Sequence, residues 1–277
     1  MKIGIIGNGF VGNAINEGFK NHYEMIIYDK NPHKSRNPHK ELYNLKYIFI
    51  CVPTPMDSEG NLDLSIVKEA IGGLGDAKTL IIKSTVTPSA GTTLINQFPQ
   101  HTFIFNPEFL TERTAVEDFK NPSRIILGGP AAPVNNIFNI YKKIFPEADY
   151  ILTDSKTACF IKYFCNCFFA AKISLMNEFK QIAEIENIDW NMAIEGLLSS
   201  GWVNSMHTLV PGPDNKAGFG GKCFPKDINA FIRYSRAIGI EPTMLQAAWN
   251  KNLEVRLSND WLEIPGVINI NKFIKEI

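Results

Sequence analysis

The chain has 277 residues, 45% of them hydrophobic, and its 28 Lys and Arg residues balance its 28 Asp and Glu residues. This length allows two domains, and the neutral balance lacks the basic excess typical of nucleic-acid binding, so we expect no nucleic-acid partner. The five cysteines form no Cys-x-x-Cys pair, so we expect no metal site and reduced thiols. No apolar run reaches the length of a membrane span, and the opening MKIGIIG leads directly into a strand. We therefore expect a cytoplasmic protein without a signal peptide or membrane contact.

The first predicted strand is followed by a glycine-rich turn and a helix. The strand covers Lys2 to Ile6, the turn reads GNGFVG from residue 7 to residue 12, and the helix begins near Phe10. A second strand, Met25 to Tyr28, ends at Asp29. A GxGxxG segment between a strand and a helix, with an acidic residue about twenty positions beyond the first glycine, is typical of dinucleotide binding.

Each glycine of this turn has a physical reason to be there. Gly7 makes the tight turn, Gly9 leaves room for the pyrophosphate, and Gly12 lets the helix pack closely on the strand. The pyrophosphate then meets the N–H groups at the start of the helix. Asp29 accepts hydrogen bonds from the ribose hydroxyls and repels a 2′-phosphate, so we expect NAD rather than NADP.

Strand and helix signals alternate to about residue 153 and predict a parallel sheet covered on both faces. Further strands are expected at 47–52, 79–84, 103–105 and 125–127, with a helix at 64–74. Ligands of such sheets bind at the carboxyl ends of the strands. The segments 52–55, 84–86 and 106–112 are therefore expected to converge on the cofactor.

From about Asp154 the pattern becomes helical. Lys156 to Ile185 contains no Pro or Gly and predicts one helix of about thirty residues, longer than a small domain requires, so we expect it to form a homodimer interface as well. Shorter helices are expected at 191–198 and 226–238. The expected domains are residues 1–153, which bind NAD, residues 154–262, which bind the substrate, and a short tail, 263–277.

The segment GFGGKCFPKD, residues 218–227, predicts a reactive thiol. A helix that begins near Pro225 places Cys223 at its amino end, where N–H groups, the helix dipole and two neighbouring lysines favour a thiolate. The glycines let the backbone approach a ligand closely. The simpler interpretation is a buried structural thiol beside a surface aspartate.

Six segments in order resemble the UDP-glucose/GDP-mannose dehydrogenase family, most closely its UDP-glucose 6-dehydrogenases. They are GNGFVG, ICVPTP, KSTV, NPEFLTE, IKYFCNCFFAAKISLMNEF and GFGGKCFPKD, and the resemblance extends from Met1 to roughly Trp261. It implies an α/β fold with an N-terminal Rossmann-type doubly wound sheet, followed by a mostly helical domain with a long central helix.

The resemblance also implies a reaction, the four-electron oxidation of a nucleotide sugar, UDP-glucose to UDP-glucuronate, with two NAD⁺. Cys223 matches the nucleophile that forms a thiohemiacetal and then a thioester. Lys162 and Asn166 match groups that stabilise an oxyanion, although an isolated helix lysine is more often a solvated charge. Asp227 matches a carboxylate that positions water or relays protons, and Glu108 one that acts in thioester hydrolysis.

Further assignments follow from the same resemblance. Thr85 matches a threonine that holds the catalytic water, and Glu112 an acidic position near the site; a helix cap and a surface charge explain these two residues equally well. The expected cofactor-binding residues are Gly7, Gly9, Phe10, Val11, Gly12, Asp29, Lys34, Val52, Pro53, Thr54, Ser84, Thr85 and Glu112. The expected substrate-binding residues are Glu108, Phe109, Leu110, Glu112, Lys162, Asn166, Phe219, Gly220, Gly221 and Cys223.

The chain departs from the family in three places. Cys159 stands where the family has an acidic residue, residues 200–203 lack an arginine that crosses the dimer, and the sequence ends before the family's carboxyl-terminal nucleotide-binding domain. The alternatives are a dehydrogenase of GDP-mannose or another UDP-sugar, a β-hydroxyacid dehydrogenase of the 6-phosphogluconate type, and a non-catalytic or partner-dependent NAD-binding subunit.

Overall fold

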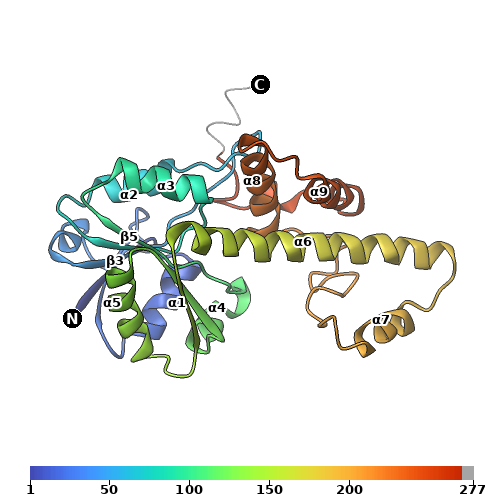
Figure 1. Ribbon diagram of the computed structural model, residues 1–277, viewed down its shortest axis with the longest axis horizontal. Coiled ribbons are helices and arrows are strands. Elements are labelled where there is room, and N and C mark those ends of the chain that lie inside the picture. Colours follow the sequence, from blue (N-terminus) through green and yellow to red (C-terminus); the bar gives the residue numbers. More distant parts are fainter. Residues whose placement is uncertain (270–277) are drawn as a thin grey trace. The chain divides into compact units, whose positions relative to one another are not determined.

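The chain divides into two compact units, which are described here from a computed structural model that covers residues 1–269 (Figure 1). The first unit consists of Met1–Thr54 and Leu62–Lys162, and the second of Pro55–Asn61 and Tyr163–Ile277. This division falls at Lys162, whereas the boundary expected from sequence lies between residues 153 and 154. Of the expected tail, residues 270–277 lie outside the described residues.

Within residues 1–269, seven strands form one sheet in the order β2-β1-β3-β4-β5-β6-β7. Runs rich in Ile and Phe form strands readily and tolerate burial on both faces. Ile6 lies beside Ile50, Ile50 beside Ile82, and Ile82 beside Phe105, so four parallel strands end in one row. The strands are β1 (Lys2–Ile6), β2 (Glu24–Tyr28), β3 (Tyr47–Ile50), β4 (Thr79–Ile82), β5 (Thr102–Phe105), β6 (Arg124–Gly128) and β7 (Asp149–Thr153).

The expected parallel pairing is confirmed for β1 to β5 but was wrong for β6, and β7 was not among the expected strands. Strand β6 pairs antiparallel with β5 through Phe105 and Gly128, and β7 runs parallel to β6. In an antiparallel pair the second strand begins at the edge where the first one ends. The connection from Asn106 to Ser123 therefore does not return to the opposite edge, as a parallel crossover would.

The second unit is helical, as predicted. Three of its helices pack together around buried Cys167, Phe219, Ile228 and Ala248. Met56, Trp261 and Val267 form a smaller cluster, in which one residue of the 55–61 segment meets residues near the end of the described chain. The helices are α6 (Ser155–Ile185, whose first residues belong to the first unit), α7 (Trp190–Ser199), α8 (Phe224–Ala237), α9 (Thr243–Val255) and the short 3-10 helix η3 (Asp260–Leu262).

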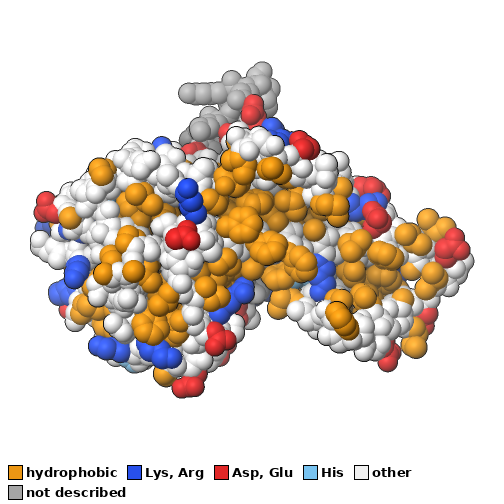
Figure 2. Space-filling view, viewed as in Figure 1, with side chains coloured by type: hydrophobic (Ala, Val, Ile, Leu, Met, Phe, Trp, Pro, Cys, Tyr) orange, Lys and Arg blue, Asp and Glu red, His pale blue; other side chains and the backbone are white. Residues whose placement is uncertain are grey.

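Helix α6 carries an exposed apolar face. Phe168, Leu175, Phe179 and Ile182 are each about half exposed, and Figure 2 shows hydrophobic side chains gathered along this helix. Contrary to our expectation, α6 is long and apolar enough to cross a membrane, since an 18-residue window has a mean hydropathy of 1.3. The core helix of a soluble protein passes the same test, and 44% of that window is buried in the structure.

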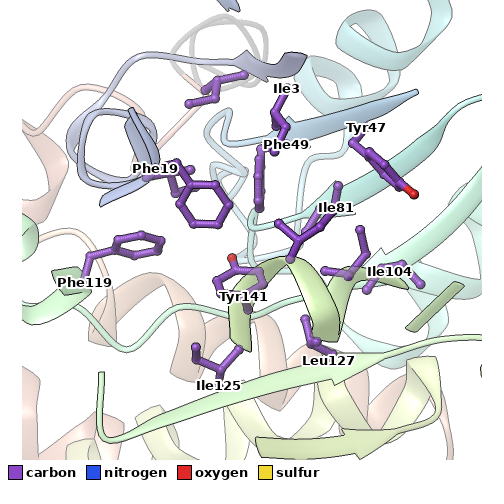
Figure 3. Close-up of a cluster of buried hydrophobic side chains, with 14 of the residues drawn as sticks. Ile3, Phe19, Tyr47, Phe49, Ile81, Ile104, Phe119, Ile125, Leu127 and Tyr141 are labelled. Carbon is purple, nitrogen blue, oxygen red and sulfur yellow. The ribbon is translucent and has the colours of Figure 1, made fainter. Parts of the chain in front are cut away.

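Two apolar cores cover the faces of the sheet in the first unit. Helices α1 (Phe10–Phe19), α4 (Ala115–Lys120) and α5 (Ala131–Lys142) pack on one face, where Phe19 meets Phe49 and Tyr141 edge to face (Figure 3). The 3-10 helix η1 (His39–Asn44), α2 (Ser65–Gly72), α3 (Pro88–Gln97) and the start of α6 pack on the other face. Loops are therefore left to occupy the carboxyl edge.

Candidate active site

The glycine-rich turn after β1 meets the steric demands predicted for it. Gly7 has φ +94°, and a Cβ there would lie 2.7 Å from the carbonyl oxygen of Cys51. A Cβ on Gly12 would lie 2.0 Å from the carbonyl oxygen of Gly7, so the turn and the first turn of α1 pack closely. A Cβ on Gly9 would have no neighbour within 4 Å, which leaves open space beside the start of the helix.

The start of α1 and the end of β2 meet at this turn. Helix α1 begins with Phe10 and Val11, has Gly9 as its N-cap, and receives no side-chain cap from the described residues. The Asp29 carboxylate accepts hydrogen bonds from the backbone N–H of Asn8 at 2.6 Å and of Asn31 at 2.8 Å. The Lys34 carbonyl accepts one from Asn8 Nδ2 at 2.7 Å. Asp29 and Lys34 therefore both lie beside the glycine-rich turn.

The segments after β3 and β4 are joined by hydrogen bonds, as their neighbouring strand ends predict. Ser84 Oγ donates to the Val52 carbonyl at 2.7 Å, and Thr54 Oγ1 donates to the Thr85 carbonyl at 2.9 Å. Pro53, which lies between Val52 and Thr54 in sequence, is exposed. A small hollow beside these segments is lined by Ile82, Ser84, Thr85, Val86, Phe105, Pro107, Cys159 and Lys162.

Cys159 forms part of the wall of that hollow. Its side chain is buried, and burial raises the pKa of the thiol to about 12. The thiol is therefore neutral at the position where the resemblance led us to expect an acidic side chain.

Glu108 and Lys162 form a buried ion pair at the carboxyl edge. Lys162 Nζ lies 3.0 Å from Glu108 Oε1 and donates to the Glu108 carbonyl at 2.6 Å, while Glu108 Oε2 accepts the N–H of Leu110 at 2.7 Å. Burial raises the pKa of Glu108, but the charges of Lys162 and Lys83 and the Leu110 N–H outweigh it and lower the pKa below its ordinary value. Glu108 is therefore an ionised carboxylate, and Lys162 is not a solvated charge.

The loop residues around Glu108 have different surroundings. Two cations lie near the ring of Phe109. Lys162 Nζ is 5.3 Å from the ring centroid, and Arg124 Cζ is 4.4 Å from it. Glu112 is the exposed first residue of the 3-10 helix η2 (Glu112–Thr114). Phe109 and Leu110 thus lie at the ion pair, whereas Glu112 lies at the surface of the first unit.

Lys83 is a buried charge that sequence reasoning missed. It follows β4 directly, and its Nζ donates to Asn106 Oδ1 at 3.1 Å, an oxygen that also accepts the hydroxyl of Tyr141. Burial lowers the pKa of Lys83 to about 8, although the charge of Glu108 opposes this. A lysine immediately after the apolar run of 79–82 was the available signal.

In the second unit, Cys223 is the N-cap residue of α8, and Pro225 lies in the first turn, as predicted. Asp227, one turn further along, is 1% exposed, and its carboxylate accepts Asn166 Nδ2 at 2.6 Å and forms a short ion pair with Lys226. Cys223 is half-buried. Asn166, Asp227 and the Cys223 backbone are thus brought together.

The loop before α8 is tightly folded. Phe219 is buried, and Gly218 and Gly221 have φ values of +67° and +74°, which favour glycine. Gly220 lies against Arg256 and Asp260, so closely that a Cβ would approach their side chains to 2.4 Å. Close packing, rather than free space, therefore explains the glycine at position 220.

The first unit thus has the features of a dinucleotide-binding unit, and the helical unit carries a thiol and buried ionisable groups. The chain belongs to the UDP-glucose/GDP-mannose dehydrogenase family, since residues 35–147 match the family's NAD binding domain and residues 156–254 match its central domain. NAD is therefore the cofactor, and the structure fits it through the open space at Gly9 and the acidic Asp29. The glycine-rich turn precedes the matched range.

Individual relatives agree with this family. The chain is 36% identical over 235 residues to a UDP-glucose 6-dehydrogenase of Rickettsia bellii. This match covers 78% of this chain and 51% of the relative. A UDP-glucose dehydrogenase structure from Pyrobaculum islandicum has a TM-score of 0.81 at 26% identity, covering 91% of this chain and 67% of that one. The chain spans about half the length of the curated relatives that it matches.

The fold is also found outside the family. A 3-hydroxyisobutyrate dehydrogenase of Mycobacterium tuberculosis has a TM-score of 0.72 at 15% identity, covering 90% of this chain and 91% of that one. At this identity the likeness shows the fold alone.

Two glycine substitutions separate packing from cofactor binding. We expect Gly12→Ala to lower the free energy of unfolding by about 3 kcal/mol, because its methyl group overlaps the Gly7 carbonyl. We expect Gly9→Ala to change it by less than about 1 kcal/mol and to weaken NAD binding about tenfold, because the methyl group enters the open space beside α1. Urea unfolding and NAD titration test both, and equal NAD affinity of Gly9→Ala and wild type would contradict the placement of the pyrophosphate.

A second prediction concerns Lys83. Its pKa falls from 10.5 to about 8 on folding, so between these values the unfolded chain holds a proton that the folded chain has released. Stability from this group therefore rises with pH through that window, by up to about 1.4 kcal/mol per pH unit. Between about pH 8 and pH 10, we expect the free energy of unfolding of the wild type to rise with pH relative to that of Lys83→Met, as measured by urea unfolding. Parallel stability curves for the two proteins would show that Lys83 keeps its ordinary pKa.

Proposed function

We propose that the chain is an NAD-dependent nucleotide-sugar 6-dehydrogenase that oxidises UDP-glucose to UDP-glucuronate in the cytoplasm. The observation that carries this proposal is the position of Cys223 as the N-cap residue of α8, one turn before buried Asp227. The helix N-terminus stabilises negative charge on sulfur and so favours the nucleophilic thiolate. Residues in and beside the glycine-rich turn would hold NAD⁺, which supplies the hydride acceptor for both oxidation steps.

A cysteine suits this reaction because an aldehyde carbon cannot lose a hydride until it becomes tetrahedral. The Cys223 thiolate adds to the carbonyl carbon, and the oxygen takes up a proton, which gives a thiohemiacetal. The second oxidation converts this adduct into a thioester. Water then attacks the thioester carbonyl, the carbon–sulfur bond breaks, and the acid leaves while the thiolate is restored.

Two buried groups have the charge that these steps require. Ionised Glu108 can accept a proton from the attacking water, since its low pKa keeps it deprotonated at neutral pH. Lys162 holds an ammonium in a buried position, where it can stabilise an oxyanion. Thr85 lines the same hollow as Lys162, which supports a role for it in holding water.

Asn166 and Asp227 have roles on the second unit. Asn166 donates one amide hydrogen to Asp227 and keeps its carboxylate oriented. Asp227 then positions water or relays protons near the thiol, one helical turn away. Glu112 lies exposed on the first unit, and we propose no catalytic role for it.

The thiol gives the direct test. In purified protein supplied with NAD⁺ and a panel of nucleotide sugars, we expect NADH formation with UDP-glucose and two NADH for each UDP-glucuronate. Cys223→Ser should lower acid production by a factor on the order of 10³ or more while NAD affinity is unchanged. The matched control is Cys165→Ser on α6, which should retain the wild-type rate.

The panel also separates the alternatives. Undiminished turnover in Cys223→Ser would favour a β-hydroxyacid dehydrogenase, whose reaction needs no nucleophilic thiol and whose fold this chain shares. Preference for GDP-mannose or another UDP-sugar would change the substrate and keep the mechanism. NAD binding without turnover of any sugar would favour a partner-dependent subunit.

We also propose that the chain forms a homodimer through α6. Phe168, Leu175, Phe179 and Ile182 are spaced by seven, four and three residues, so they lie on one stripe of the helix. Because each is already about half buried, covering the rest would contribute roughly half of the about 1.5 to 3 kcal/mol expected for full burial. A second copy of the same helix can cover this stripe by isologous contact.

The dimer is tested by charge on that stripe. Phe168→Asp combined with Phe179→Asp should convert a dimer to a monomer, because both carboxylates would be buried without partners. The control is Glu184→Ala, which removes an exposed charge from the same helix. Light scattering after size exclusion measures the mass, and a wild-type monomer, or a double variant that stays dimeric, would refute this interface.

A further inference from the structure

Helix α9, which sequence reasoning did not predict, holds the glycine loop that precedes Cys223. Asn252 on this helix is fully buried, and both ends of its side-chain amide bind the backbone of one residue. Its Oδ1 accepts the N–H of Phe219 at 2.6 Å, and its Nδ2 donates to the Phe219 carbonyl at 3.0 Å. This pair of bonds fixes the position and the orientation of residue 219.

Arg256, at the end of α9, holds the same loop from its other side. Its guanidinium is buried at 3% exposure and binds Asp260 through Nε at 2.9 Å and Asp214 through Nη2 at 2.7 Å. Nη1 donates to the Ala217 carbonyl at 3.3 Å, and Asp260 in turn accepts the N–H of Gly221 at 3.4 Å. The network therefore reaches the backbone on both sides of the loop.

Arg256 keeps both of its carboxylate partners ionised. Burial raises the pKa of Asp214 and of Asp260, but the hydrogen bonds and charge of Arg256 outweigh it and lower both values. Two carboxylates thus remain ionised around one guanidinium. A planar, forked donor is required here, because Arg256 must satisfy groups that lie in different directions.

The loop itself cannot move independently of these side chains. The Cβ of any residue at position 220 would lie 2.4 Å from Arg256 Nη2 and from an Asp260 oxygen, and one at position 218 would lie 2.4 Å from Asn252 Oδ1. Gly221, whose N–H is held, is two residues from Cys223. A shift of the loop would therefore shift the thiol at the N-terminus of α8.

We propose that Asn252 and Arg256 are positioning residues that hold the Gly218–Gly221 loop in the conformation that orients Cys223. The role assigned to Cys223 rests on the proposed function. Both side chains act through the backbone between residues 217 and 221, which they hold directly or through Asp260 by hydrogen bonds. Small errors in the position of a nucleophile are costly, since a displacement of about 1 Å can lower a rate about 100-fold.

Two variants, one nearly isosteric and one that preserves charge, test the proposal. Asn252→Asp keeps the acceptor for the Phe219 N–H and places an oxygen against the Phe219 carbonyl, and Arg256→Lys keeps the charge but removes the fork. The matched controls are Asn250→Asp, on the exposed side of α9, and Arg236→Lys, which forms a surface pair with Glu241. Urea unfolding establishes that each variant folds.

The main readout needs no substrate. The rate at which iodoacetamide modifies Cys223, followed by the mass of its peptide, should change about tenfold or more in both loop variants and stay at the wild-type value in both controls. In turnover, kcat should fall about tenfold or more while the KM for NAD⁺ stays constant, because the glycine-rich turn after β1 is untouched. A general loss of stability would not change the modification rate and kcat while leaving the KM for NAD⁺ constant.

Each outcome decides the proposal. Modification rates and kcat in the loop variants that equal those of the controls would overturn it. If Asn252→Asp fails to fold, Arg256→Lys decides by the same two measurements. If wild-type protein oxidises no nucleotide sugar, the proposed function fails, but the modification rates still show whether α9 positions the thiol.

Discussion

A carboxylate that is buried and yet ionised constrains the first unit more than any other group. Glu108 can keep its charge only because Lys162 contacts it, Lys83 adds a second positive field, and the Leu110 N–H donates to it. An isolated buried charge is unfavourable by several kcal/mol, so each member of this set requires the others. The requirement fixes the loop after β5, the lysine after β4 and the start of α6 relative to one another within this unit.

The second unit repeats this solution with different residues. Asp227 is matched by Lys226 and the Asn166 amide, and Arg256 by Asp214 and Asp260. Buried ion pairs contribute little net stability compared with an apolar core, because desolvation offsets their attraction. Their contribution is orientation: they leave few arrangements in which all charges are satisfied. The apolar cluster around Phe219 and Ile228 supplies the stability.

Local signals allowed part of this structure to be predicted from the sequence. The glycine-rich turn, the uninterrupted helix from Ser155 to Ile185 and the position of Cys223 before Pro225 all depend on neighbouring residues. The direction of β6 could not be predicted, because it depends on pairing with β5 across an intervening connection. Asn252 was missed for the same reason, because only tertiary burial distinguishes it from a surface asparagine, whereas Lys83 had a local signal in its place directly after an apolar run.

Residues 55–61 belong to the second unit although the first unit surrounds them in sequence. Met56 pairs with Val267 through a backbone hydrogen bond of 2.8 Å, and the Glu59 carbonyl accepts Arg233 Nε. The backbone therefore passes between the two units three times, and no single cut in the gene separates them into self-contained fragments. A fragment that ends at Lys162 would carry a seven-residue excursion with its partners removed, and the complementary fragment would expose Trp261. The two halves are therefore suited to reassembly as a split protein rather than to use as independent modules.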